Sequence, residues 1–148
     1  MSTSITTITK TDLLIIGGGP AGLSTATFFA RVNRPFILYD SGLYRNAQSP
    51  IAHTIMGHEG VSPASYRAQV RNQLEALYGQ GEHSLRNGAF RKGKIVSLVK
   101  DAERFEAVDQ DGNKISARKV VLATGIKDVL PSIPGTSSPT LVSLGDNR

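Results

Sequence analysis

The sequence predicts an α/β fold built on a parallel β-sheet, and three features indicate it. A short apolar segment, residues 12–16, runs directly into the glycine-rich turn GGGPAG, and a helix-compatible stretch follows over residues 21–32. A second apolar segment, residues 36–39, ends at Asp40, and a third, residues 120–124, leads into an Ala-Thr-Gly string. Strand, turn, helix and strand in that order are typical of a βαβ unit, whose two strands lie parallel.

The segment after the second strand predicts a long loop and a second helix. Residues 42–60 are rich in Gly, Asn, Ser, Pro and His, and an irregular stretch of this length in a compact domain is usually functional. Ser62 and Pro63 are residues that begin helices, and we expect the helix to end near Gly79. Its apolar positions recur at helical spacing on one face, namely Tyr66, Val70, Leu74 and Leu77.

The C-terminal half predicts an antiparallel β-meander inserted ahead of the last strand. Apolar segments lie around Phe90, at residues 95–99 and at residues 105–108, and Asp111-Gly112 marks a tight turn. A final pair of segments follows at residues 115–118 and 120–124. The whole is therefore expected to be a Rossmann-like domain, with a parallel sheet and an inserted meander.

One domain of common size accounts for the 148 residues. We expect a polar leader over residues 1–10, a single domain over 11–135 and an irregular tail over 136–148. No apolar run approaches the roughly 20 residues that span a bilayer, and the N-terminus lacks the apolar core of a secretory signal. No membrane association is expected, and the predicted location is cytoplasmic.

The composition excludes several classes of function. The net charge of +5 comes from scattered Lys and Arg without a dense run, so nucleic-acid binding is not expected. The absence of cysteine excludes a disulphide framework, a thiolate metal site and a catalytic thiol within these residues. His53, His58 and His83 come without a carboxylate cluster at ligand spacing, so no metal site is expected.

The glycine-rich turn predicts a dinucleotide site. Gly17, Gly19 and Gly22 fit G-x-G-x-x-G, in which the first glycine allows the turn, the second lets backbone approach a diphosphate, and the third lets helix pack on strand. Asp40 ends the next strand 18 residues beyond Gly22, where a carboxylate can accept hydrogen bonds from ribose hydroxyls. An acid there suits FAD or NAD and disfavours a 2′-phosphate. The alternative is a chance glycine pattern with Asp40 as a turn residue.

A family resemblance selects FAD from these nucleotides. The strings DLLIIGGGPAGLS, LYDSGLYRNA, HTIMGHEG and VVLATGIKDVLPSIPG resemble the thioredoxin reductase-like flavoproteins, class II of the pyridine nucleotide-disulphide oxidoreductases, and particularly their fungal dithiol-oxidase branch, over roughly residues 11–134. The resemblance implies an FAD site in which the first string holds the diphosphate and the second the ribose. It implies contacts from Gly18, Gly19, Pro20, Ala21, Asp40, Ser41, Arg45, Asn46, His53 and the backbone of Ala123.

The chain departs from the family pattern after Gly135. Relatives continue into a nicotinamide-binding domain with a second glycine motif and a C-x-x-C pair, and neither occurs in this sequence. We therefore expect the N-terminal FAD-binding part of a flavin oxidoreductase of thiols or disulphides, truncated relative to the family, with no catalytic residue assigned. A non-catalytic nucleotide-binding module and an NAD-binding dehydrogenase fragment are the alternatives. A small-molecule thiol or disulphide is the expected substrate, and a homodimer or a partner is expected to cover the face that the missing segment would cover.

Overall fold

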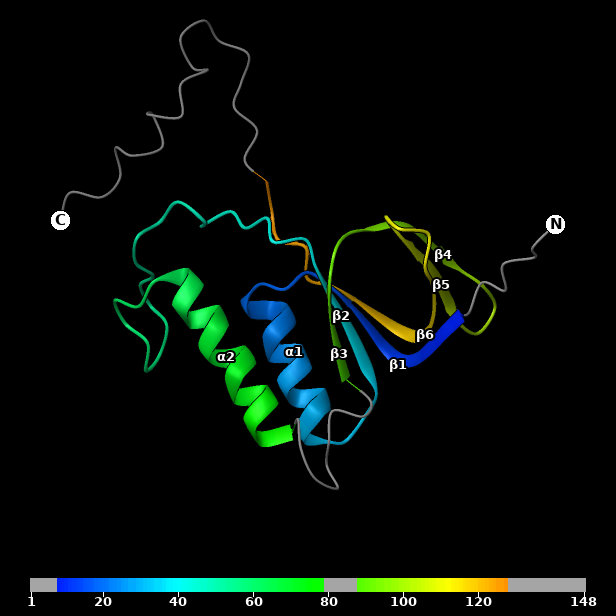
Figure 1. The fold of residues 1–148 in the computed structure, drawn as a ribbon, viewed down its shortest axis with the longest axis horizontal. Helices are drawn as coiled ribbons and strands as arrows, with labels where there is room; N and C mark the ends of the chain where they lie inside the picture. Colours follow the sequence, from blue (N-terminus) through cyan, green and yellow to red (C-terminus); the bar gives the residue numbers. More distant parts are fainter. Residues whose placement is uncertain (1–7, 79–87, 128–148) are drawn as a thin grey trace, which may run out of the picture.

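The structure, a computed structural model, describes residues 8–78 and 88–127 (Figure 1). Its elements alternate at first between strand and helix and then become all strand. In chain order they are β1 (Ile8–Ile16), α1 (Pro20–Arg31), β2 (Phe36–Asp40), α2 (Pro63–Tyr78), β3 (Gly88–Lys92), β4 (Ile95–Lys100), β5 (Phe105–Asp109) and β6 (Lys114–Leu122).

All the strands form one sheet in the order β3-β2-β1-β6-β5-β4. The four strands β3, β2, β1 and β6 run parallel, and β5 and β4 continue the sheet antiparallel beyond β6. The predicted fold class, an α/β Rossmann-like domain with a parallel sheet and an inserted meander, is confirmed. One detail was wrong: the segment around Phe90 belongs to the parallel part, where it pairs with Leu38 of β2.

Two element boundaries differ from the prediction. The strand β1 begins at Ile8, so the last three residues of the expected leader already pair with β6. The two segments expected at residues 115–118 and 120–124 merge into the single strand β6, which ends at Leu122, ahead of residues 123 and 124. Its first half pairs with both β1 and β5, whereas residues 119–122 pair with β1 and have no second strand neighbour within residues 8–78 and 88–127.

The sheet has a hydrophobic core on each face because side chains alternate along each strand. Leu13 and Ile15 of β1 pack with Phe36 of β2 and Leu74 of α2 on the face that both helices cover (Figure 1). Leu14 belongs to the second core, on the opposite face. Each helix thus buries one apolar stripe, as its sequence pattern predicts.

The buried apolar face of each helix is narrower than the sequence pattern indicates. Phe28 of α1 is 62% exposed, and Leu77 of α2, which the helical spacing places on the apolar face, is 59% exposed. Tyr78 packs against the helix-side core at the end of α2. Within the described ranges, neither helix combines the length and the apolar composition needed to cross a membrane.

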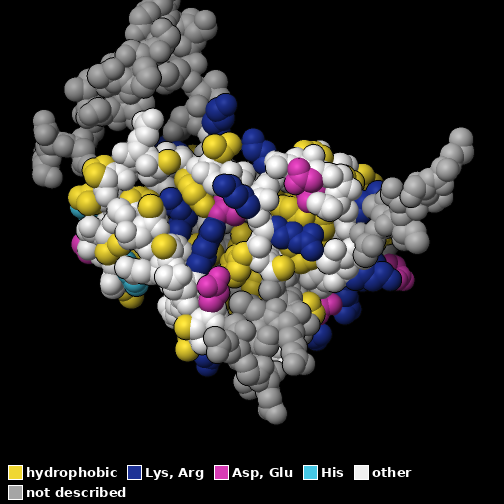
Figure 2. Space-filling model, viewed as in Figure 1, with side chains coloured by type: hydrophobic (Ala, Val, Ile, Leu, Met, Phe, Trp, Pro, Cys, Tyr) yellow, Lys and Arg dark blue, Asp and Glu magenta, His cyan; other side chains and the backbone are white. Residues whose placement is uncertain are grey.

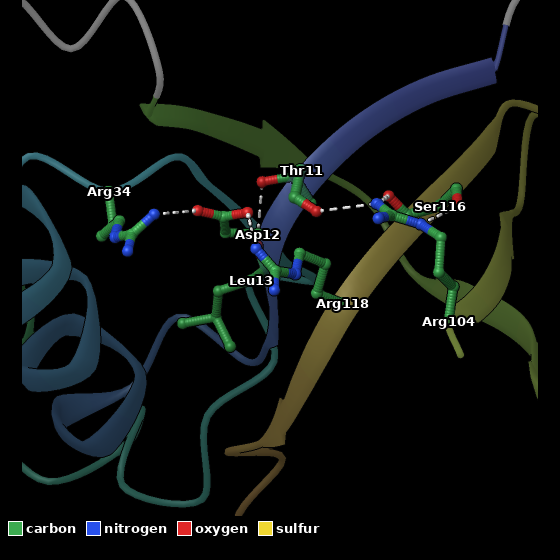
Figure 3. A network of polar contacts seen from close by, with 7 residues as sticks. All are labelled: Thr11, Asp12, Leu13, Arg34, Arg104, Ser116 and Arg118. Atoms are coloured by element: carbon green, nitrogen blue, oxygen red, sulfur yellow. Dashed lines mark hydrogen bonds and ion pairs between the residues drawn. The ribbon is translucent and has the colours of Figure 1, made fainter.

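A polar network fixes the junction between the parallel part and the meander (Figure 3). Arg104, just ahead of β5, donates from Nε to the Ser116 hydroxyl at 2.8 Å and from Nη2 to the Ser116 carbonyl at 2.9 Å. Its Nη2 also donates to the Thr11 carbonyl at 3.1 Å. Asp12 of β1 pairs with Arg118 of β6 at 3.7 Å. The hydrogen bonds of Arg104 therefore join β1 to β6, whereas the Asp12–Arg118 pair is a long contact to an exposed arginine.

Candidate functional site

An open cavity of about 800 Å³ lies where β1, β2 and β6 end and α1 begins. Its volume is within the range of small-molecule sites, about 300–1,000 Å³. Ligands of open α/β sheets bind outside the carboxyl ends of the strands, and this cavity has that position. Ten of the twelve residues predicted to hold a cofactor line it: Gly17, Gly18, Gly19, Pro20, Ala21, Asp40, Ser41, Arg45, Asn46 and Ala123.

Two glycines of the turn are required by close packing. Gly17 has a φ of +118°, and a Cβ there would lie 2.1 Å from the carbonyl oxygen of Ala123. A Cβ at Gly22 would lie 1.9 Å from the carbonyl oxygen of Gly17. The backbone of Gly17 donates to the Tyr39 carbonyl at 2.8 Å, which joins the turn to β2. The turn is therefore wedged between the strand ends and the first turn of α1.

Gly19 differs from these two because its surroundings are open. A Cβ at this position would meet nothing within 4 Å. Gly19 is also the N-cap of α1, without a side-chain cap, and the first turn of the helix carries no acidic residue. Helix N-termini leave backbone N–H groups unsatisfied and carry a partial positive charge, so they bind anions. An open space beside such a terminus fits a diphosphate.

The side chain of Asp40 lies against the turn. Asp40 is 7% exposed, and a Cβ at Gly18 would lie 2.2 Å from the Asp40 Cγ. Gly18 therefore admits the carboxylate to the edge of the cavity, a packing role that its place in the motif does not reveal.

Three donors hold the Asp40 carboxylate. Its Oδ1 accepts the backbone N–H of Gly42 at 2.9 Å, and its Oδ2 accepts the hydroxyl of Tyr44 and Nη2 of Arg71. Burial alone would raise the pKa of Asp40, but the hydrogen bonds from Tyr44, Gly42 and Arg71 outweigh it and hold that pKa below its ordinary value. Asp40 is thus a carboxylate at neutral pH.

The two arginines of α2 were not anticipated as site residues. Arg71 reaches Asp40, while Arg67 stacks over the ring of Tyr44, with 3.6 Å between its guanidinium carbon and the ring centroid. Arg67 also donates to the Oδ1 of Asn46 at 3.4 Å. Figure 2 shows basic side chains with an acidic one among them on the face where α1 and α2 begin. The sequence feature that could have indicated them is their position on the same helix face as the apolar Val70 and Leu74.

The far wall of the cavity comes from segments distant in sequence. The turn between β3 and β4 supplies Lys94, and the strand end of β6 supplies Thr124 beside Ala123. The backbone of Gly93 donates to the Asp40 carbonyl at 2.9 Å, and that of Ala123 donates to the Ile16 carbonyl at 2.8 Å. Strand pairing therefore brings the Ala-Thr-Gly string to the glycine turn.

Two predicted residues do not line the cavity. Gly22 lies behind the turn, as its packing role requires. His53 is in the loop before α2, where its Nδ1 lies 2.6 Å from the Oε1 of Glu59. The Oε2 of Glu59 accepts the backbone N–H of Thr54 at 2.8 Å. The structure thus shows a loop-internal pair at His53, and a cofactor contact there stays a prediction.

No metal site is found within residues 8–78 and 88–127, where no three His, Asp or Glu side chains gather. His83 and the expected tail, residues 136–148, lie outside the described residues. The same holds for the end of the expected domain after residue 127.

Comparison with known proteins gives consistent relatives. The sequence pattern of the pyridine nucleotide-disulphide oxidoreductases matches residues 11–146. The chain is 45% identical to "Thioredoxin reductase tcpT" of Claviceps purpurea, covering 84% of this chain and 37% of that protein. It is 38% identical to "Thioredoxin reductase sirT" of Leptosphaeria maculans, covering 84% and 36%.

A solved structure agrees with these relatives in fold. The oxidoreductase from Agrobacterium tumefaciens superposes with a TM-score of 0.75 at 29% identity, covering 86% of this chain and 40% of that one. The chain thus spans less than half the length of these relatives. The resemblance to thioredoxin reductase-like proteins is confirmed, and the chain belongs to the pyridine nucleotide-disulphide oxidoreductases, a family of FAD-binding flavoproteins.

Proposed function

We propose that this chain forms the FAD-binding part of a thioredoxin reductase-like flavin oxidoreductase that acts on thiols or disulphides. The observation that carries the proposal is the lining of the cavity. The glycine turn, the start of α1 without a side-chain cap, and the Asp40 carboxylate all lie around this one space. These are the groups that a dinucleotide needs for its diphosphate and its ribose.

The residues divide the cofactor between them by their chemistry. The open backbone at Gly19 and the N–H groups at the start of α1 suit the diphosphate, and the guanidinium of Arg45 can add charge-assisted hydrogen bonds. Asp40 suits the adenosine ribose, and Ala123 offers its backbone on the opposite wall. FAD, when bound, supplies two-electron redox chemistry through its isoalloxazine.

Reconstitution with FAD tests this proposal. The purified chain is stripped of nucleotide, titrated with FAD while flavin fluorescence is followed, and its visible spectrum is recorded before and after adding dithionite. We expect saturable binding, a protein-bound flavin spectrum and bleaching by the reductant. NAD in the same titration serves as competitor. A chain that ignores FAD, or that prefers NAD, would refute the assignment of the cofactor.

A non-catalytic nucleotide-binding module is the second candidate. It is favoured by the lack of cysteine in the 148 residues, because the C-x-x-C thiol relay of the family must then come from elsewhere. The two candidates differ in turnover. Oxidation of a dithiol by the FAD-loaded chain, measured as oxygen uptake, would support the enzyme. Binding of FAD without turnover would support the non-catalytic module.

We also propose that a second copy of the chain covers the C-terminal half of β6, on the side where β6 no longer pairs with β5. Residues 119–122 pair with β1 alone within the described part of the chain, and Leu122 is 68% exposed. Sedimentation velocity is expected to find a dimer at micromolar concentration, and a monomer at all concentrations would contradict this. The cytoplasmic location stays a prediction from the sequence.

A further inference from the structure

We propose that α2 supports the cofactor site from outside the cavity: Arg71, through Asp40, and Arg67, through Tyr44, are positioning residues for the adenosine-ribose end of FAD. We call Asp40, Tyr44, Arg67 and Arg71 the α2 brace. The inference rests on the proposed function, since it assumes FAD in the cavity beside Asp40. It adds two helix residues that do not line the cavity.

Within the α2 brace, Tyr44 and Arg71 hold one carboxylate oxygen of Asp40 and leave an acceptor position on the other. Tyr44 and Arg71 both donate to Oδ2, and Gly42 donates to Oδ1. A carboxylate offers about four acceptor positions, two on each oxygen. Counting the contacts made by the described residues, about one position on Oδ1 is left for a ribose hydroxyl. On its other side the carboxylate is confined by Gly18, where a Cβ would lie 2.2 Å from Oδ2.

Tyr44 links the two arginines into one unit. Its hydroxyl donates to Asp40, while its ring lies under the guanidinium of Arg67 at 3.6 Å. Arg67 is only 8% exposed, and its Nη1 reaches the Oδ1 of Asn46 at 3.4 Å. Burial, and the hydrogen bond to Asp40, raise the pKa of Tyr44, so the hydroxyl stays a donor. The brace thus holds both Asp40 and the loop residues that follow it.

The helix geometry explains why both arginines reach the loop. Positions 67 and 71 are four apart and share one side of α2 with the buried Leu74. The planar guanidinium suits both tasks, because it can stack on an aromatic ring and donate in a fixed direction to a carboxylate. Pre-ordering these groups lowers the conformational cost that ligand binding would otherwise carry.

The test compares FAD affinity across matched variants. Arg71→Met and Tyr44→Phe each remove one donor from Asp40, and Arg71→Lys restores the charge without the planar group. Arg118→Met is the control, because it also removes an arginine from an aspartate, at Asp12, away from the cavity. We expect the dissociation constant for FAD to rise about tenfold in Arg71→Met, equivalent to about 1.4 kcal/mol, to recover partly in Arg71→Lys, and to stay unchanged in Arg118→Met.

A pH titration separates positioning from general destabilisation. Among the residues that the structure describes, Tyr44 from the loop and Arg71 from α2 are titratable or charged groups that donate to the Asp40 carboxylate. Removing Arg71 should therefore raise the pKa of Asp40 and move the acid limb of FAD binding to higher pH. A loss of stability alone would lower affinity without moving that limb. The Asp40 pKa is measured independently in the FAD-free chain by carbon NMR titration of its carboxyl group.

The outcomes distinguish the brace from the proposed function. Wild-type chain that ignores FAD would defeat both. Wild-type chain that binds FAD, with Arg71→Met binding as tightly as Arg118→Met and with an unmoved Asp40 pKa, would overturn the brace alone. A weakened Arg71→Met whose acid limb stays in place would assign Arg71 to fold stability and likewise overturn it. A joint change in affinity and in the acid limb would support it.

Discussion

The substitution Gly22→Ala should destabilise the fold although it places a better helix former in a helix. A Cβ at this position would lie 1.9 Å from the Gly17 carbonyl oxygen and 3.4 Å from the Ile15 Cγ2. To restore a separation of at least 3.0 Å, α1 and the turn must move apart by about 1.1 Å. The Cβ is fixed by the backbone of residue 22 and its neighbour is a backbone carbonyl, so no side-chain rotation can relieve the contact.

Two opposing free energies decide the size of the effect. Alanine is favoured over glycine inside a helix by up to about 1 kcal/mol. Overpacking a well-packed site costs about 1–3 kcal/mol, and the upper end applies where backbone must move. The expected net loss is therefore about 2 kcal/mol, and the helix-side core around Leu23 and Ala26 loosens with it. With a typical urea dependence, the unfolding midpoint falls by about 1 M.

Gly19→Ala is the matched control and predicts the opposite pattern. Gly19 has a φ of −76°, which alanine adopts freely, and a Cβ there meets nothing within 4 Å. Its methyl group would project into open space at the start of α1, where we place the diphosphate. Alanine is a poorer N-cap than glycine, so urea unfolding of the FAD-free chain should show a loss below about 1 kcal/mol, while FAD affinity falls at least tenfold. The reasoning is refuted if Gly22→Ala is as stable as wild type, or if Gly19→Ala binds FAD normally.

Three further predictions follow from the same contacts. Because the pKa of Asp40 is held below its ordinary value, its contribution to stability should be complete at pH values well above that ordinary value. It should be lost as the pH falls through the lowered pKa, and acid unfolding should show a smaller loss in Asp40→Asn. Arg104→Met removes three hydrogen bonds at the junction of β1 and β6 and should cost about 1–3 kcal/mol in urea unfolding, while an unchanged midpoint would contradict the role of Arg104. Gly17→Ala combines a φ of +118° with a Cβ contact of 2.1 Å and should yield little folded protein by circular dichroism, whereas well-folded Gly17→Ala would show that the turn is pliable.

The local part of the site could be predicted from the sequence. The βαβ unit is encoded in contiguous residues, so the apolar run before Gly17 and the acid at the end of the next strand fix the turn and the position of Asp40. The order of the sheet was less accessible. The strand β3 pairs parallel with β2, yet its sequence shows only a short apolar segment around Phe90, which suits either direction.

The α2 arginines could not be assigned from local pattern. Apolar spacing indicates only which positions of a helix face the core, and arginine on a helix is ordinarily a solvated residue. Arg67 is buried because Tyr44 and Asn46 of the preceding loop fold over it, and that contact depends on the path of the loop. The contact of His53 with Glu59 likewise depends on the path of the loop, and the cofactor contact that the family resemblance implies for His53 stays a prediction.

The cavity is a consequence of strand pairing more than of any single motif. Gly17 donates its N–H to the end of β2, Ala123 donates to the end of β1, and Gly93 donates to Asp40. Each of these bonds extends a parallel ladder by one step beyond the last paired residue, and together they set the turn, the Ala-Thr-Gly string and the β3–β4 turn around one space. A register slip of one residue would reverse the facing of each side chain along the strand. We therefore expect substitutions that remove contacts between β1 and β6, such as Arg104→Met, to affect the cavity from farther along the sheet.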